Sequence, residues 1–324
     1  MKKFELTTEF ITNALGKKLF RIKALVEFGS VKAGELGGYA EKEENISQDG
    51  NAWVSGDAKV FGNAWVSDDA CVYGDAKVFG NAWVSGDAWV HGNAKVFGNA
   101  EVYGDTEVSG DALVYGNAKV SDNVRVSGNA KVFGNAEVYG DTEVSGDAKV
   151  FGNAEVYGDA KVFGNAWVSD DAEVSGDAKV FGNAWVSGDA LVSGNAKVFG
   201  NAEVYGDTEV SGDAKVSDNA EVSGDAKVSD NAEVSGDAKV FGNAEVYGDA
   251  DYALVKGFGT EFRYTTFYRD KNKKIMVNCG CFHGDLEAFR KQVKETRSGK
   301  IAKEYLMIAD LMEYHFTSED SSDE

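Results

Sequence analysis

The stretch KVFGNAEVYGDTEVSGDA, which occupies residues 95–112 and recurs unchanged at 131–148 and 197–214, decides the fold of this chain. It contains three copies of a six-residue word, V-x-G-[N/D]-A-x, and valine recurs at every sixth position from Val54 to Val246 without an insertion or deletion. A period of six matches neither an α-helix nor a continuous alternating strand, but it matches a short strand followed by a turn. Valine suits an inward strand position, and its two neighbours then point outward because strand side chains alternate.

Longer words give the number of strands in one coil. The word KVFGNA begins at Lys59, Lys77 and Lys95, which are three hexads apart, and most of its later copies are again separated by three or six hexads. Three hexads make an 18-residue coil, so the spacing predicts a parallel β-helix with triangular coils. The 33 valines of the series then predict about 11 coils, stacked at roughly 4.8 Å. The Gly-Asn and Gly-Asp pairs between the strands have the conformational freedom and hydrogen-bonding groups that tight turns need.

The hexapeptide also resembles a known repeat. V-x-G-[N/D]-A-x is similar to the hexapeptide of left-handed parallel β-helices, in which an aliphatic and a small residue point inward, and this resemblance implies a left-handed coil. The segment VKAGELGGYAEKEENISQ at residues 31–48 resembles the segment that leads into the repeat of the YdcK-type hexapeptide-repeat proteins. The chain is also similar to repeat proteins carried by tailed phages and prophages. The resemblance covers residues 1 to about 250 and implies a fold, but no settled function.

The period and its limits divide the chain into four parts. We predict an N-terminal β cap at 1–49, a hexapeptide-repeat β-helix at 50–255, a C-terminal α+β domain at 256–316 and a disordered acidic tail at 317–324. The expected strands of the N-terminal cap are 4–10 and 18–27. The fold class is therefore an all-β solenoid with a cap or an additional domain at each end.

The C-terminal part has a different pattern. Residues 261–269 and 275–282 read as strands, and 286–296 and 301–316 read as helices with apolar residues three and four apart, which gives a ββαα order. Asp285 is placed to cap the first of these helices. A stack of coils exposes an unpaired edge at its end, so this domain is either a cap over that edge or a head that binds a partner.

The charge of the repeat limits the classes of partner. Residues 51–250 carry 13 basic and 33 acidic side chains, so nearly all of the net charge of −21 belongs to the repeat. Such a field repels nucleic acid and anionic membranes, and we expect no direct binding to either. The sequence contains no apolar run long enough to span a membrane and no basic start followed by an apolar run. Three cysteines are too few for a disulfide framework. A cytoplasmic protein, in a bacterial host if it is phage-encoded, is the simplest interpretation.

No catalytic constellation stands out, so we predict neither an enzyme nor a cofactor. Many hexapeptide helices are acyltransferases, and that chemistry usually needs a histidine as general base together with loops that interrupt the coil. The repeat contains one histidine, His91, and no interrupting loop. An acyltransferase therefore stays as an alternative.

Cys279, Cys281 and His283 could supply three soft metal ligands from alternate positions of one strand. Zinc sites usually have two to four residues between their cysteines and need a fourth ligand, which is not evident. Two cysteines that line the buried face of a hairpin are the favoured interpretation, and we predict no metal.

Outward side chains one coil apart in the sequence should form columns along the solenoid. One column is aromatic and a neighbouring one is mostly lysine, until the word at Lys161 comes only two hexads after the previous one and moves the pattern to an adjacent face. Long outward aromatic columns are typical of interfaces. Stacking of like residues copied by duplication would give the same pattern. The interface candidates are Lys59, Phe61, Lys77, Phe79, Lys95, Phe97, Phe133, Phe151, Phe163, Phe181 and Phe199.

Three functions follow from these features. We expect a structural or protein-binding β-solenoid, plausible as a phage protein, with a protein partner or a second copy bound through the aromatic columns or the C-terminal domain. The first alternative is an acidic mimic of DNA that inhibits a host DNA-binding or defence protein, because the charge of the repeat per unit length approaches that of duplex DNA. The second is the acyltransferase. The oligomeric state stays open.

Overall fold

The computed structural model describes residues 2–248, 251–259 and 263–317. The chain divides into two compact units, Met1–Gly176 and Asp177–Glu324, which are described in turn. The predicted disordered tail at 317–324 lies outside the described residues except for Thr317, which ends a helix. Among the described residues, no helix is both long enough and apolar enough to cross a membrane.

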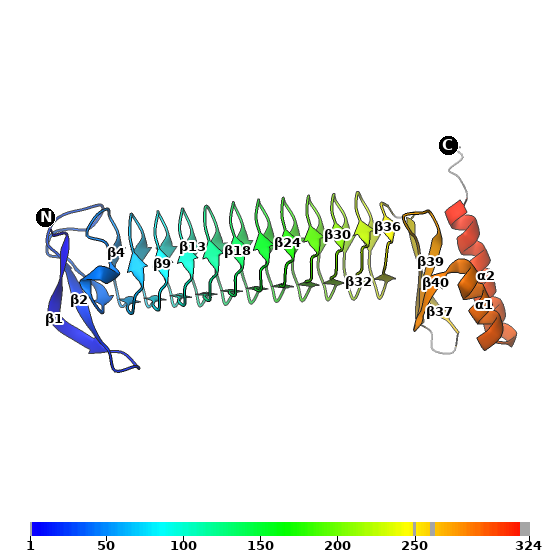
Figure 1. Cartoon of the computed structure of the whole chain (residues 1–324), viewed down its shortest axis with the longest axis horizontal. Coiled ribbons are helices and arrows are strands. Elements are labelled where there is room, and N and C mark those ends of the chain that lie inside the picture. Colours follow the sequence, from blue (N-terminus) through cyan, green and yellow to red (C-terminus); the bar gives the residue numbers. More distant parts are fainter. Residues whose placement is uncertain (1, 249–250, 260–262, 318–324) are drawn as a thin grey trace. The chain divides into compact units, whose positions relative to one another are not determined.

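The repeat of the first unit forms stacked coils, with one two-residue strand in each hexad (Figure 1). Strands three hexads apart pair in parallel, so each coil contributes one strand to each of three sheets. The first sheet contains β3 (Leu36–Ala40), β5 (Lys59–Val60), β8 (Lys77–Val78), β11 (Lys95–Val96), β14 (Leu113–Val114), β17 (Lys131–Val132), β20 (Lys149–Val150) and β23 (Trp167–Val168). The second contains β4 (Trp53–Val54), β7 (Cys71–Val72), β10 (Trp89–Val90), β13 (Glu107–Val108), β16 (Arg125–Val126), β19 (Glu143–Val144) and β22 (Lys161–Val162). The third contains β6 (Trp65–Val66), β9 (Trp83–Val84), β12 (Glu101–Val102), β15 (Lys119–Val120), β18 (Glu137–Val138), β21 (Glu155–Val156) and β24 (Glu173–Val174). The predicted parallel β-solenoid with coils of three hexads is confirmed.

Valine and alanine make the core of the coils. Val96 and Ala100 are fully buried, and so are their valine and alanine counterparts among the described residues of the other coils. Threonine replaces alanine at Thr106, where the buried hydroxyl donates a hydrogen bond to the carbonyl of Tyr103 at 2.7 Å. The preceding turn thus satisfies the hydroxyl of Thr106, which matters because an unsatisfied buried hydroxyl is costly.

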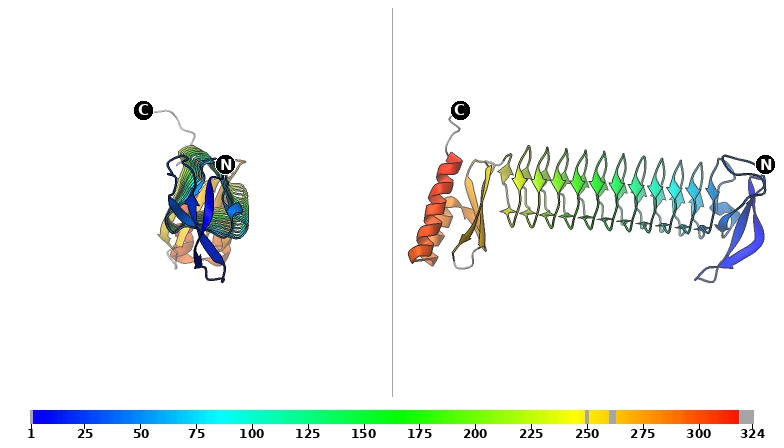
Figure 2. Two further views of the ribbon diagram at one scale, coloured as in Figure 1. Left: turned by 90° about the vertical axis from the view of Figure 1, so that its left-hand side faces the viewer. Right: turned by 180° about the vertical axis from the view of Figure 1, so that it is seen from behind.

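The N-terminal segment is partly a coil, which the sequence did not reveal. β1 (Phe4–Thr12) and β2 (Lys18–Ala24) form an antiparallel hairpin, drawn in dark blue in Figure 2. β2 also pairs with β3. β3 then pairs in parallel with β5, and Ile46 bridges to Val66 beyond the short 3₁₀ helix η1 (Glu43–Asn45). Residues from β3 onward thus stack as a further coil. The first unit holds about eight coils and the second four, against the predicted total of about 11.

In the second unit the same two-residue strands form three parallel sets. They are β26 (Trp185–Val186), β29 (Glu203–Val204), β32 (Glu221–Val222) and β35 (Lys239–Val240); β25 (Lys179–Val180), β28 (Lys197–Val198), β31 (Lys215–Val216) and β34 (Glu233–Val234); and β27 (Leu191–Val192), β30 (Glu209–Val210), β33 (Lys227–Val228) and β36 (Glu245–Val246).

The described residues of the C-terminal domain form four strands where the sequence predicted two. β37 (Tyr252–Phe258), β38 (Arg263–Arg269), β39 (Ile275–Cys279) and β40 (Phe282–Asp285) form an antiparallel sheet in chain order. The predicted strand at 275–282 is split by a two-residue turn in which Gly280 has a φ of 61°, and β37 was assigned to the end of the repeat. The predicted start of the other strand at 261 lies outside the described residues, as do 260 and 262.

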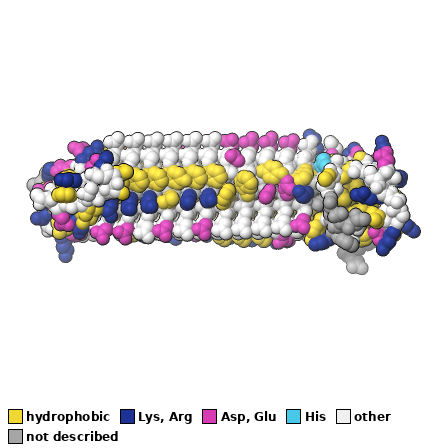
Figure 3. All heavy atoms as spheres, turned by 90° about the horizontal axis from the view of Figure 1, so that it is seen from below, with side chains coloured by type: hydrophobic (Ala, Val, Ile, Leu, Met, Phe, Trp, Pro, Cys, Tyr) yellow, Lys and Arg dark blue, Asp and Glu magenta, His cyan; other side chains and the backbone are white. Residues whose placement is uncertain are grey.

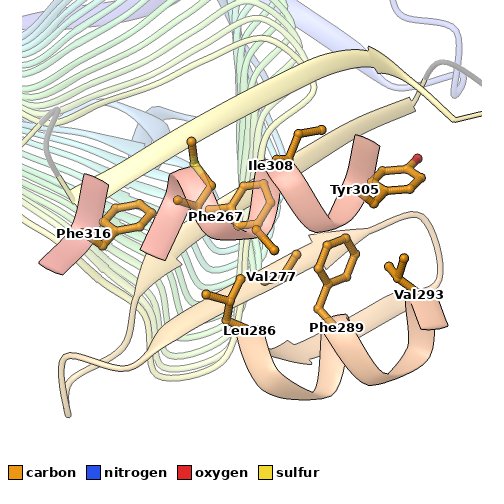
Figure 4. Packing of buried hydrophobic residues seen from close by; sticks show 10 residues of the cluster. Phe267, Val277, Leu286, Phe289, Val293, Tyr305, Ile308 and Phe316 are labelled. Carbon is orange, nitrogen blue, oxygen red and sulfur yellow. The ribbon is translucent and has the colours of Figure 1, made fainter. Parts of the chain in front are cut away.

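Two helices complete this domain. α1 (Leu286–Thr296) and α2 (Gly299–Thr317) pack on one face of the sheet, where Phe267, Phe289 and Tyr305 meet edge to face (Figure 4). Asp285 accepts a hydrogen bond from the backbone of Ala288 at 2.7 Å, which confirms its predicted role as the cap of α1.

The same sheet lies against the last coil of the second unit. The Lys239 N–H donates to Thr266 Oγ1 at 3.1 Å, and its carbonyl accepts from Asn278 Nδ2 at 2.6 Å. The carbonyl of Phe241 accepts from the Tyr268 hydroxyl at 3.1 Å. Backbone groups that a further coil would have satisfied are thus bound by the C-terminal domain, which covers this edge of the solenoid.

Candidate functional site

An outward aromatic column runs along the first sheet of the first unit. Its neighbouring rings are parallel within 1–4°, with centroids 4.8–5.0 Å apart, and it ends where Phe151 meets Trp167 edge-on at 6.1 Å. Figure 3 shows it as a continuous yellow stripe. Because each ring face covers the next ring, the column presents mainly ring edges to solvent. Its members are Phe61, Phe79, Phe97, Tyr115, Phe133 and Phe151.

A lysine column runs beside these rings (Figure 3). Lys77 and Lys95 are register partners, and Lys131 lies beyond Leu113 in the same sheet. Within the described part of the chain, no carboxylate oxygen lies within 4.0 Å of the Nζ atom of Lys77, Lys95 or Lys131. Several lysines of other columns are paired: Lys119 Nζ, for example, lies 2.8 Å from Glu137 Oε1. Like charges at neighbouring strand positions repel each other, and no described carboxylate contacts Lys77, Lys95 or Lys131 to offset this repulsion.

The two ends of the lysine column have other contacts. Lys59 Nζ donates to the carbonyl of Asp57 at 2.9 Å, and Lys149 Nζ lies 4.0 Å from the centroid of the Trp167 ring. We call the aromatic and lysine columns together the basic aromatic stripe.

The turn beside the stripe carries a ladder of amides. Each asparagine donates from Nδ2 to the Oδ1 of the next one at 2.9–3.1 Å, and the series ends on the carboxylate of Asp171. The ladder is uncharged along the stripe and orders this edge. Its asparagines are Asn63, Asn81, Asn99, Asn117, Asn135 and Asn153.

The remaining interface candidates lie on another sheet. Phe163 follows β22, which belongs to the second sheet, and Lys161 Nζ lies 3.8 Å from Glu143 Oε2. In the second unit Phe181 and Phe199 stack at 5.0 Å beside the register pair Lys179 and Lys197. The structure therefore divides the candidates between two faces, as the shorter step before Lys161 indicated.

A second ladder in the first unit is acidic. Asp69, Asp87 and Asp105 occupy the same turn position in successive coils. Partial exclusion of water from its carboxylate, together with the carboxylates of Asp105 and Asp69, raises the pKa of Asp87. Asn123 takes the next place in this column and donates to Asp141 Oδ1 at 2.6 Å, which shows how an amide relieves the stacking of like charges.

We expect Asp87→Asn to raise the urea midpoint of unfolding at pH 7 and low salt. Folding raises the pKa of this carboxyl group, so its ionised form destabilises the folded state at pH values above the folded-state pKa. At pH values below the unfolded-state pKa of about 3.9 the group is protonated in both states, and this destabilisation is absent. The increase in the urea midpoint of Asp87→Asn should therefore become smaller as the pH falls toward 4 and as salt is added. Asp111→Asn is the control, because its neighbours in the column are Asn93 and Asn129. An equal gain in both variants would trace the effect to net charge instead.

The three candidate metal ligands do not form one set. Cys279 ends β39 and pairs with Phe282, Cys281 lies exposed in the turn, and His283 Nδ1 lies 2.6 Å from Asn278 Oδ1. Among the described residues, no group of three or more His, Cys, Asp or Glu side chains is placed to hold a metal ion. The expectation that both cysteines line the buried face is wrong for Cys281, because the turn at 280–281 interrupts the alternation.

His91 is held by its neighbours. Its ring stacks on Tyr73 with centroids 4.6 Å apart, and its Nε2 lies 2.9 Å from Glu107 Oε1.

Sequence reasoning missed a groove in the first unit. A space of about 880 Å³, partly open to solvent, lies between residues 29–35 and the second sheet, where Trp53, Cys71, Tyr73 and Trp89 line it. The signal was a Trp-Cys-Trp column with a spacing of three hexads, which leaves a small side chain between two large ones. The loop that forms the other wall carries no repeat, so its position could not be inferred from the period.

No protein-family model matches this chain, and no curated protein matches its sequence at a significant level. The structure itself defines the class: a parallel β-solenoid with three hexads in each coil and a small C-terminal domain of two helices and an antiparallel sheet.

Proposed function

We propose that this chain is a non-enzymatic, protein-binding β-solenoid whose basic aromatic stripe receives an acidic surface of a protein partner. One observation carries the proposal: Lys77, Lys95 and Lys131 lie beside the aromatic column with no carboxylate in contact among the described residues, in a chain with a net charge of −21.

The chemistry of the stripe favours carboxylates. The edge of an aromatic ring carries the positive part of its quadrupole, and the neighbouring ammonium groups carry full charges. Both would be stabilised by Asp or Glu side chains of a partner. The stacked rings are already ordered, so binding to them costs little side-chain entropy.

The same geometry argues against single-stranded nucleic acid. Proteins that bind it stack bases on exposed ring faces. Here each ring face within the column is covered by the next ring at about 4.9 Å, so a base has no platform along the column.

The partner is either another protein or a second copy of this chain, whose own acidic columns have the required charge. We also propose that the protein is phage-encoded and acts in the bacterial cytoplasm, which is supported by the resemblance of residues 31–48 to YdcK-type proteins and of the whole chain to phage repeat proteins. The DNA-mimic alternative is supported by the stacked carboxylates of Asp69, Asp87 and Asp105.

Charge reversal tests the stripe. We expect the triple variant Lys77→Glu, Lys95→Glu, Lys131→Glu to lose the partner that the wild type captures from a bacterial lysate, or its own self-association measured by light scattering. Glutamate occupies the same hexad position in other coils, as at Glu101 and Glu107, so the coils should still form.

The matched control reverses three lysines that are paired with glutamates, Lys119, Lys215 and Lys227, and so makes the same change in net charge. Loss in the first variant and retention in the control supports the stripe. Identical capture and identical mass in all three proteins would refute it. Recovery of DNA-binding proteins by all three, reversed by salt, would favour DNA mimicry instead.

A further inference from the structure

The groove beside the N-terminal loop has aromatic walls in a fixed arrangement. Trp53 and Cys71 are register partners, and so are Cys71 and Trp89, so a thiol lies between two indoles in one column. Trp53 is 5% exposed and is held edge-on by Phe28, with ring centroids 5.4 Å apart. Trp89 is 52% exposed and meets Tyr73 at 6.4 Å and 76°.

Tyr73 is itself held by a second ring. His91 stacks on its ring, and Glu107 holds His91 through Nε2. The perpendicular rings of Tyr73 and Trp89 therefore form a corner that needs no rearrangement to accept a ligand, while the exposed part of Trp89 leaves one side open to solvent.

The charged groups of the groove are acidic. Asp69 and Glu35 line it, and no Lys, Arg or His is among the described residues that line it. Asp69 Oδ1 is fixed by Asn51, whose Nδ2 donates to it at 2.9 Å. Burial and the carboxylates of Asp69 and Asp87 raise the pKa of the Cys71 thiol, so an added negative charge is disfavoured there. The groove should therefore repel anions.

We propose that this groove binds an alkylammonium cation, with a quaternary ammonium group against Trp53, Tyr73 and Trp89 and with Asp69 and Glu35 as its counter-charges. Indole and phenol faces attract such cations, and the attraction is strongest where the cation loses water. A neutral apolar ligand would use the rings but would leave the negative charges of Asp69 and Glu35 without a counter-charge from the ligand. The notch over Cys71 provides the room for the headgroup.

A comparison of choline with its neutral isostere 3,3-dimethylbutan-1-ol tests whether the groove requires a positive charge on the ligand. Binding of both to the full chain is measured by calorimetry at constant ionic strength. We expect choline to bind at least tenfold more tightly. Asp69→Asn should remove most of this preference and leave binding of the alcohol unchanged. Equal affinities of the two ligands for the wild type would overturn the proposal, as would an absence of choline binding.

Substitutions of residues that line the groove test whether choline binds there. Trp89→Leu should abolish choline binding, and leucine is found at this hexad position in Leu113 and Leu191. Trp83→Leu is the control, because Trp83 is 43% exposed on the third sheet, where it stacks with Trp65 away from the groove. Cys71→Trp should fill the notch with a residue that the column already uses, and so block binding without removing a ring. Choline affinity that survives Trp89→Leu and Cys71→Trp would contradict the assignment.

A further experiment distinguishes a cation on a protein side chain from a free small cation. A peptide that contains trimethyl-lysine and binds more tightly than choline, with the same dependence on Trp89, would identify a protein side chain as the ligand. Weaker binding of the peptide would identify a free small cation. The groove and the basic aromatic stripe lie on different sheets, so failure of either proposal leaves the other intact.

Discussion

A chain that ends after Tyr247 is expected to associate through its exposed last coil, with a marked rise in mass by light scattering. The truncation removes Thr266, Asn278 and Tyr268, which bond to backbone groups of Lys239 and Phe241. Three parallel sheets would then end in unpaired strands, and unpaired edges recruit other edges.

A chain that ends after Thr317 is the control, since it keeps all the described residues of the C-terminal domain. It should have the mass of the full chain. A truncation at Tyr247 that retains β-sheet circular dichroism and the mass expected from its length would show that this domain is not needed as a cap.

Replacing Gly128 by valine is expected to lower the stability of its unit by about 3 kcal/mol or more, which is a large effect for one residue in a turn. Gly128 has a φ of 68°, and a Cβ atom there would lie 2.9 Å from the carbonyl oxygen and 3.0 Å from the nitrogen of Gly146. Both contacts are to backbone, so the neighbouring coil would have to move.

Gly16→Val separates the strain of a positive φ from the clash with the neighbouring coil. Gly16 has a similar φ of 77°, but nothing lies within 4 Å of the position of its Cβ. It should suffer only the strain of the left-handed backbone. The difference between the urea midpoints of the two variants gives the contribution of the contact between neighbouring coils. An equal loss of stability in both variants would show that this contact does not contribute to stability.

The repeat made most of the fold predictable. A buried valine such as Val96 and a small residue such as Ala100 alternate with turns at a constant interval of six residues, and the spacing of the longer word KVFGNA gives three hexads in each coil. The C-terminal domain was predicted less well. Its helices and the Asp285 cap follow local rules, but the turn at 280–281 splits a run of strand-forming residues, and the alternation that placed Cys281 on a buried face failed there.

The candidate surfaces were also only partly predictable from the sequence. The aromatic column from Phe61 to Phe151 was predicted from the spacing, because side chains one coil apart must be neighbours. That no carboxylate of the described residues contacts Lys77, Lys95 or Lys131 was not predictable, because ion pairing depends on which glutamates of adjacent columns come within reach.

The sequence by itself therefore determined the coil, its inward residues and the columns on its faces, since an uninterrupted period leaves one register for stacking. The tertiary structure alone decided what surrounds these columns. It placed the loop at 29–35 beside Trp53 and Trp89 to form a groove, and it laid the C-terminal sheet over the last coil. Neither arrangement has a period, and each depends on contacts between segments whose separation along the chain carries no regular signal.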